Sequence, residues 1–226
     1  MLDFSRTFEK YEALVAQVDK VFTAMHETHK DCVRCKIHCC DCCYAVFDLT
    51  LIESVYINHH FNKSLSRRER RPVVSRAEKA DRKFYQIKRK LHKMHLKEGK
   101  SPEDVLFQLA QERAQCPLLN DEKLCDLYAG RPITCRVYGI PTSIGGKAHI
   151  CGESGFKEGT AYPTVNLDSI NDRLFELSKD LLEEVGSNNT KMHMSLVPVS
   201  TALMTDYDEE HFGIKQGKHP DAETIA

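Results

Sequence analysis

Apolar residues recur along much of the chain at alternating spacings of four and three, the period of an amphipathic α-helix. The longest stripes run from Phe4 to Met25 and from Val73 to Met94. Capping motifs mark the starts of two further helices. The pattern predicts helices over residues 3–30, 51–61, 72–98, 102–115 and 168–185.

The segment between the last two predicted helices lacks this period and is rich in Pro, Gly and β-branched residues. Within it, Gly145-Gly146 predicts a tight turn before a short strand. We therefore expect a mainly α fold, in which helices wrap around an irregular cysteine-rich metal-binding core (32–151) with few short strands. We expect a single domain over residues 1–204, followed by a polar C-terminal tail over 205–226.

The chain has 226 residues and no apolar run near the roughly 20 residues of a membrane-spanning helix. Its first residues, MLDFSRTFEK, mix both charges and differ from a secretory signal. We therefore expect a cytoplasmic protein with no membrane partner. Ten cysteines then need an explanation, because structural disulfides are rare in a reducing compartment.

The cysteines form two groups. Six lie within twelve residues, in C-V-R-C-K-I-H-C-C-D-C-C, and the other four are separated by eight, nine and fifteen residues. So dense a set of thiols does not follow the apolar period of a packed core, and adjacent cysteines do not readily pair with each other. The pattern favours metal ligation, with ten candidate ligands. These are Cys32, Cys35, Cys39, Cys40, Cys42, Cys43, Cys116, Cys125, Cys135 and Cys151.

Two metal chemistries fit these cysteines. Zinc needs four ligands in a tetrahedron, and Cys32 with Cys35 and Cys39 with Cys42 have the spacing of zinc-binding pairs. The second group has no such pair, whereas an iron–sulfur cluster accepts ligands from one compact loop together with distant single cysteines. We therefore favour one or two [4Fe–4S] clusters, with zinc as the alternative. Two four-cysteine centres would leave two thiols spare.

Three residues beside the second group are candidates for contact with the cofactor. Arg131 and Arg136 flank Cys135, and Tyr128 shortly precedes them. Cationic donors near thiolates stabilise the anionic form and offset the charge of a cluster. The alternative is that Arg131-Pro132 only shapes a turn.

The formal net charge of −1 conceals a basic segment. Residues 63–97 contain fourteen Lys and Arg against three Asp and Glu. One interpretation is a site for an acidic protein or redox partner, and the other is a solvated helix face. We do not expect nucleic acid, because base-stacking aromatics are not interleaved with the charges. The two long apolar stripes could also pack on each other or across a homodimer.

Two motifs resemble those of the YkgJ-type cysteine-cluster family, whose signature the flagellin lysine N-methylases share. The first is Cys35-x3-Cys39-x2-Cys42-Cys43 followed by Asp48-Leu49-Thr50 and Glu53. The second is Cys116-Pro117-Leu118 with Cys125-x2-Tyr128-x2-Arg131-Pro132-x2-Cys135-Arg136-x-Tyr138-Gly139. The family is described as a zinc- or iron-chelating domain, so the resemblance implies metal binding by the cysteines of both motifs. Cys32 and Cys40 are additional to the family pattern, and Cys151 matches it less closely.

Three functions follow as hypotheses. The first is an iron–sulfur protein for electron transfer or redox sensing. The second, implied by the resemblance, is a cluster-dependent methyltransferase-like enzyme that uses S-adenosylmethionine. Against it, the chain has neither a G-x-G-x-x-G motif nor a Walker-type phosphate loop. The third is a zinc-stabilised adaptor whose basic helix binds an acidic partner.

Overall fold

The computed structural model describes residues 2–214, except for the side chains at positions 102, 103, 106 and 107. The fold is mainly α with one small sheet, as the hydrophobic pattern predicts. The helices are α1 (Ser5–Thr28), α2 (Leu51–Ser64), α3 (Arg67–Glu98), α4 (Pro102–Gln111), α5 (Ile133–Val137), α6 (Leu167–Glu184) and α7 (Val199–Met204). Short 3-10 turns are η1 (Asp41–Tyr44), η2 (Tyr128–Gly130) and η3 (Thr190–Met194). No helix within residues 2–214 is both long enough and apolar enough to cross a membrane.

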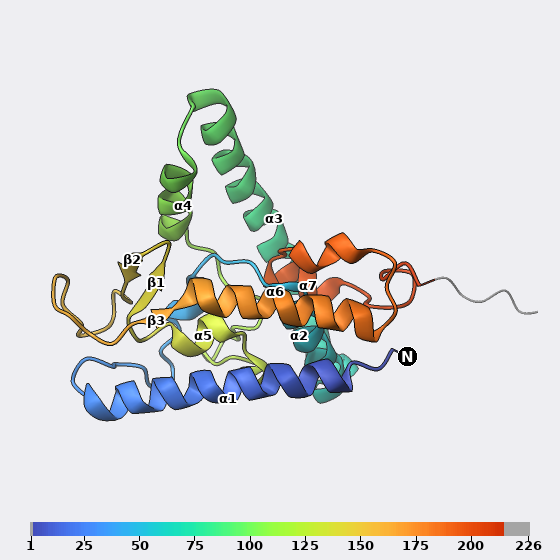
Figure 1. Ribbon diagram of the computed structural model, residues 1–226, viewed down its shortest axis with the longest axis horizontal. Coiled ribbons are helices and arrows are strands. Elements are labelled where there is room, and N and C mark those ends of the chain that lie inside the picture. The colour runs from blue at the N-terminus through green and yellow to red at the C-terminus, as the bar shows by residue number, and fades with distance from the viewer. Residues whose placement is uncertain (1, 215–226) are drawn as a thin grey trace, which may run out of the picture.

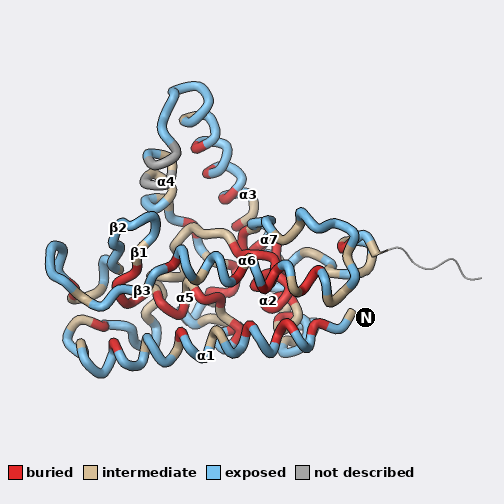
Figure 2. Tube along the Cα trace, in the orientation of Figure 1, coloured by how far each residue is buried: buried red, intermediate tan, exposed pale blue. Residues whose placement is uncertain are grey.

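Four helices build the body of the molecule. α1 and α6 lie side by side, with α2 and α5 packed against them (Figure 1). Their apolar faces form the largest core, in which Tyr11, Ile52, Ile133 and Leu181 are almost fully buried. Buried positions concentrate where α2, α6 and α7 meet (Figure 2). This core forms one wall beside the irregular cysteine-bearing loops.

α3 and α4 form an arm that projects from this body (Figure 1). The foot of α3 packs on α7, and farther out its buried residues Phe84, Ile87 and Leu91 pack with Leu109 of α4. The stripes of α1 and α3 therefore pack on different partners within the chain. Most other positions along the outer part of α3 are exposed (Figure 2).

Two helix boundaries differ from the prediction by four or more residues. α3 begins at Arg67 rather than at residue 72, because Ser66 and Glu69 form a capping box before it. α4 ends at Gln111 rather than at 115, because the chain then becomes extended and Arg113 forms a β-bridge with Ala45. That extended segment leads to Cys116 and places it beside the first cysteine group.

The predicted tail is wrong up to residue 214. Phe212 is fully buried, and its ring lies 5.9 Å from that of Phe4. Tyr207 and Ile214 pack against the same core, so the domain continues beyond residue 204. Residues 215–226 of the expected tail lie outside the described residues.

The small sheet has the order β2-β1-β3 and comprises β1 (Thr142–Ile144), β2 (Lys147–His149) and β3 (Val165–Asn166). β1 and β2 form an antiparallel hairpin, and β3 pairs with β1 in parallel. The hairpin turn is Gly145-Gly146, with φ angles of 57° and 74°, which favour glycine. The predicted turn is confirmed, and the hairpin leads directly to Cys151.

Candidate metal centre

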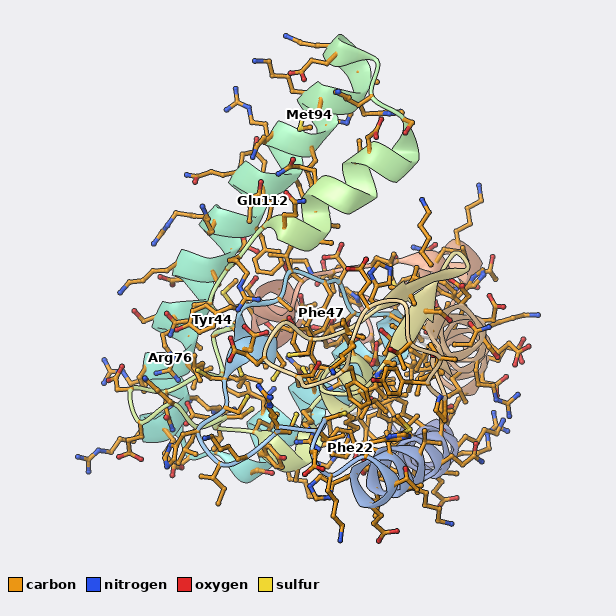
Figure 3. All side chains as sticks on the ribbon, turned by 90° about the vertical axis from the view of Figure 1, so that its left-hand side faces the viewer. Phe22, Tyr44, Phe47, Arg76, Met94 and Glu112 are labelled. Atoms are coloured by element: carbon orange, nitrogen blue, oxygen red, sulfur yellow. The ribbon has the colours of Figure 1, made fainter. Side chains whose placement is uncertain are left out.

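A cavity of about 820 Å³ brings together eight of the ten cysteines. They are Cys35, Cys39, Cys42, Cys43, Cys116, Cys125, Cys135 and Cys151. Phe22 of α1 and Phe47 mark two of its walls (Figure 3). Cys32 and Cys40 are not among its lining residues. Between residues 2 and 214, no three His, Cys, Asp or Glu side chains are arranged so that they could hold one metal ion.

Backbone hydrogen bonds between loop segments position Cys43, Cys116 and Cys125. The Cys116 N–H donates to the Cys43 carbonyl at 2.7 Å, which fixes the first group of cysteines against the second. A β-bridge between Leu119 and Cys125 then closes a loop that returns Cys125 towards Cys116. These backbone bonds bring distant parts of the sequence to one side of the cavity.

Glu53 positions the helix that carries Cys135. This carboxylate is almost fully buried; it caps the start of α2 through Thr50 and also accepts the Ile133 N–H of α5 at 3.0 Å. Burial raises the pKa of Glu53, partly offset by the hydrogen bonds from Ile133 and Thr50. One side chain thus joins the ends of two helices next to Cys135. A capping motif predicts the start of α2, but no local pattern in the sequence predicts the bond of Glu53 to α5.

Cys35, Cys39 and Cys151 lie on a more open side of the cavity. Cys35 is exposed, and its Sγ occupies space made by Gly139, where an added Cβ would lie 2.1 Å from the sulfur. Cys151 Sγ lies 3.6 Å from Asp41 Oδ2, and Asp41 in turn accepts a hydrogen bond from Arg113. The roles of Asp41, Arg113 and Gly139 were missed because they depend on contacts between distant segments.

The mutual charge effects of the thiols show which of them lie near one another. Besides burial, the charges of Cys39 and Cys151 raise the pKa of Cys35, which reaches about 11. Similarly, besides burial, the charges of Cys42, Cys116 and Cys125 hold the pKa of Cys135 well above its usual value. Since one [4Fe–4S] cluster takes four thiols, we group Cys43, Cys116, Cys125 and Cys135 as the inner set, and Cys35, Cys39, Cys42 and Cys151 as the outer set.

Cys42 lies where the two sets meet, because its charge raises the pKa of Cys35 in the outer set and of all four thiols in the inner set. Its own pKa is lowered to about 7 by a hydrogen bond with Cys43 and by the charge of Arg131, against the effect of burial. Cys42 is therefore the thiol of this cavity best prepared to act as a thiolate near neutral pH.

Arg131 faces the thiols. Its guanidinium lies 4.0 Å from the centre of the Tyr128 ring. Its charge contributes to the lowered pKa of Cys42 and partly offsets the raised pKa of Cys35 and Cys125. Its Nε is buried and has no hydrogen-bond partner within the described chain. A buried donor beside several thiols is suited to an anionic acceptor, such as a metal–thiolate cluster. Tyr128 and Arg131 both line the cavity, and their predicted contact with a cofactor stays a prediction.

Arg136 also borders the cavity, but protein groups occupy its guanidinium. It pairs with Asp19 of α1 at 2.7 Å and donates to the backbone carbonyls of Arg131 and Ala129. Because these bonds fix the loop that presents Arg131 and Tyr128, Arg136 supports the site through its neighbours. Its predicted contact with the cofactor stays a prediction.

The basic helix α3 packs beside the inner set. Arg76 donates to the Pro117 carbonyl at 2.7 Å and forms an ion pair with Asp126, next to Cys116 and Cys125 respectively. Figure 3 shows Arg76 on the lower part of α3. Part of the positive charge of α3 thus fixes the cysteine-bearing loops to the arm.

No family model, curated protein or solved structure matches this chain. The arrangement of its own side chains therefore carries the functional argument.

Proposed function

We propose that this chain binds two [4Fe–4S] clusters, one at the inner set and one at the outer set, and that it transfers electrons. The observation that carries this proposal is the convergence of eight thiols from several distant segments on one cavity. Four thiols in each set equal the usual number of ligands for one cluster. Cys32 and Cys40 are the two spare cysteines.

The surroundings of the thiols support an anionic centre. Arg131 presents a buried Nε–H donor beside the thiols that has no hydrogen-bond partner among residues 2–214. Four thiolates carry more negative charge than one zinc ion neutralises, so nearby cations stabilise either metal centre. The wide distribution of eight ligands favours clusters, whose iron corners are separated by several ångströms. Bound clusters would supply one-electron redox chemistry.

Metal and sulfide analysis of anaerobically prepared protein tests the proposal. We expect about eight iron and about eight acid-labile sulfide per chain, because each cluster contains four of each. Stoichiometric zinc without labile sulfide would overturn the proposal and favour the zinc-stabilised adaptor. Iron and sulfide near half these values would instead indicate a single cluster.

Substitutions can separate the two sets. Cys135→Ser in the inner set and Cys151→Ser in the outer set should each remove about half of the iron, since serine is a poor ligand for a cluster. Cys40→Ser is the matched control, because Cys40 belongs to the same motif but does not line the cavity. It should retain the full iron content. If Cys40→Ser lost iron while Cys135→Ser retained it, Cys40 rather than Cys135 would be a ligand.

A second candidate is an enzyme that uses S-adenosylmethionine at the outer set. The exposure of Cys35 favours it, because an open cluster edge is accessible to a small molecule. Calorimetric titration of the reconstituted protein with S-adenosylmethionine distinguishes this enzyme from an electron carrier. Micromolar binding that disappears in Cys35→Ser would favour the enzyme. The absence of binding would leave electron transfer as the better supported function.

A further inference from the structure

Two loops form an apolar rim at the mouth of the thiol cavity. Ile37 and Leu124 are 77% and 37% exposed and line the cavity, together with Tyr128, which is 64% exposed. Single exposed apolar residues are common, but three on the rim of one cavity form a surface that water solvates poorly. We call Ile37, Leu124 and Tyr128 the apolar rim.

The conformation of these loops is specific. His38 and Lys123 have φ angles of 68° and 60°, in the left-handed region that non-glycine residues seldom adopt. Each is adjacent to a residue of the apolar rim, and the two loops are joined because His38 Nδ1 lies 3.0 Å from the Glu122 carbonyl. Backbone strain of this kind concentrates at functional sites. The loops therefore hold Ile37 and Leu124 outward in a fixed arrangement.

The charge on the cavity lining is unequal. Lys36, Lys123 and Arg131 line the cavity without an ion pair in the described part of the chain. Asp41, the acidic residue of this lining, is engaged by Arg113. Asp121 and Glu122 are exposed on one of the loops but do not line the cavity. The mouth thus combines an apolar centre with positive charge, which complements an acidic surface.

We propose that the apolar rim with Lys36 and Lys123 is the docking surface for a small acidic electron-transfer protein. This inference rests on the proposed function, because an electron partner must approach the edge of the outer set. Transient redox complexes use small interfaces, in which charge steers the encounter and a few apolar contacts fix the geometry. The docking surface is therefore the cavity mouth rather than the outer face of α3. On α3, three cations form ion pairs with other segments: Arg76 with Asp126, Lys88 with Asp48 and Lys90 with Glu112.

Stopped-flow reduction of the cluster-loaded protein by a reduced, acidic [2Fe–2S] ferredoxin tests the docking surface. Lys36→Glu/Lys123→Glu should lower the second-order rate constant about tenfold at low ionic strength and flatten its salt dependence. Ile37→Ser/Leu124→Ser should lower the rate several-fold and preserve the salt dependence. The matched control is Arg82→Glu/Arg89→Glu, which makes the same charge change on exposed positions of α3.

The outcomes separate the two proposals. Iron and sulfide are measured first, and reduction by dithionite, which needs no docking surface, serves as the internal reference for each variant. Absence of iron and sulfide would remove both proposals. A full complement with parent-like ferredoxin rates in the rim variants would overturn the docking surface alone. A slower rate in the α3 control than in the rim variants would also overturn it and place the partner on the arm.

Discussion

The inner and outer cysteines line the same cavity but are held in different ways. Cys116 and Cys125 belong to a loop closed by backbone hydrogen bonds, and Cys135 lies on a helix whose first N–H is bound by the buried Glu53. Cys35, by contrast, is exposed within a run of exposed residues from Arg34 to His38. The inner set is therefore fixed by the core, whereas the outer set depends on a few contacts at the open side of the cavity.

This difference indicates that the inner set is held firmly, whereas the outer set is accessible to other molecules. Groups tied to buried hydrogen bonds open only with the surrounding structure, while exposed loops open at a much smaller cost. We expect the inner centre to be retained under mild oxidation or chelation, and the outer centre to be lost first. The same exposure gives the outer set its access to partners.

The largest predicted effect follows removal of the buried carboxylate. Glu53→Ala leaves the Ile133 N–H and the cap of α2 without their acceptor, which should lower the free energy of unfolding by about 3 kcal/mol. It should also release the inner centre, because α5 carries Cys135. Urea unfolding followed by circular dichroism, together with iron analysis, measures both effects.

Glu69→Ala is the matched control for Glu53→Ala. Glu69 is the same third-position carboxylate in the capping box of α3, but it is exposed and bonds only Ser66 there. We expect a smaller loss of stability and no loss of iron. Equal effects of the two substitutions would show that Glu53 acts only as a cap and does not position the inner set.

The next effect should be confined to the outer set. Gly139→Ala places a methyl group 2.1 Å from Cys35 Sγ, so the sulfur must move. We expect about half of the iron to be lost, with helix content unchanged by circular dichroism. Gly152→Ala is the control, because no atom lies within 4 Å of its added Cβ, although it follows Cys151 directly. Full iron content in Gly139→Ala would remove Cys35 from the ligands.

The sequence predicted the helical body better than the site because the two depend on different information. The apolar stripes specify α1, α3 and α6 through local period, and the cysteine motif identifies the thiols by composition. The burial of Phe212 and the space that Gly139 leaves for Cys35 depend on residues more than a hundred positions away. No local pattern encodes such contacts.

The start of α3 illustrates a different kind of error. A proline suits the first turn of a helix, so the pattern predicts a start at residue 72, although Ser66 and Glu69 form a capping box before it. That earlier start is encoded by a local sequence signal. The convergence of eight thiols on one cavity, in contrast, depends on how the loops fold and cannot be deduced from spacing alone.

The smallest predicted effect concerns Cys42, at the boundary between the two sets. In the metal-free protein, alkylation of Cys42 by iodoacetamide should rise with pH around its pKa of about 7, whereas that of Cys35 should rise only near its pKa of about 11. Below pH 7, Cys42 is protonated and should react slowly. Mass spectrometry of the labelled peptides over a pH series measures both midpoints.

Arg131 then tests the electrostatic part of this boundary. Arg131→Met removes a charge that lowers the pKa of Cys42, so its labelling midpoint should move to higher pH. The hydrogen bond with Cys43 is the larger cause and remains, so the midpoint should stay below the usual thiol value. Arg131→Lys should restore part of the shift, since it keeps the charge without the planar group. Lys36→Met is the control for loss of one cation at the mouth of the cavity. A midpoint that moves as far in Lys36→Met as in Arg131→Met would mean that the general field of the cavity, rather than Arg131, sets the pKa of Cys42.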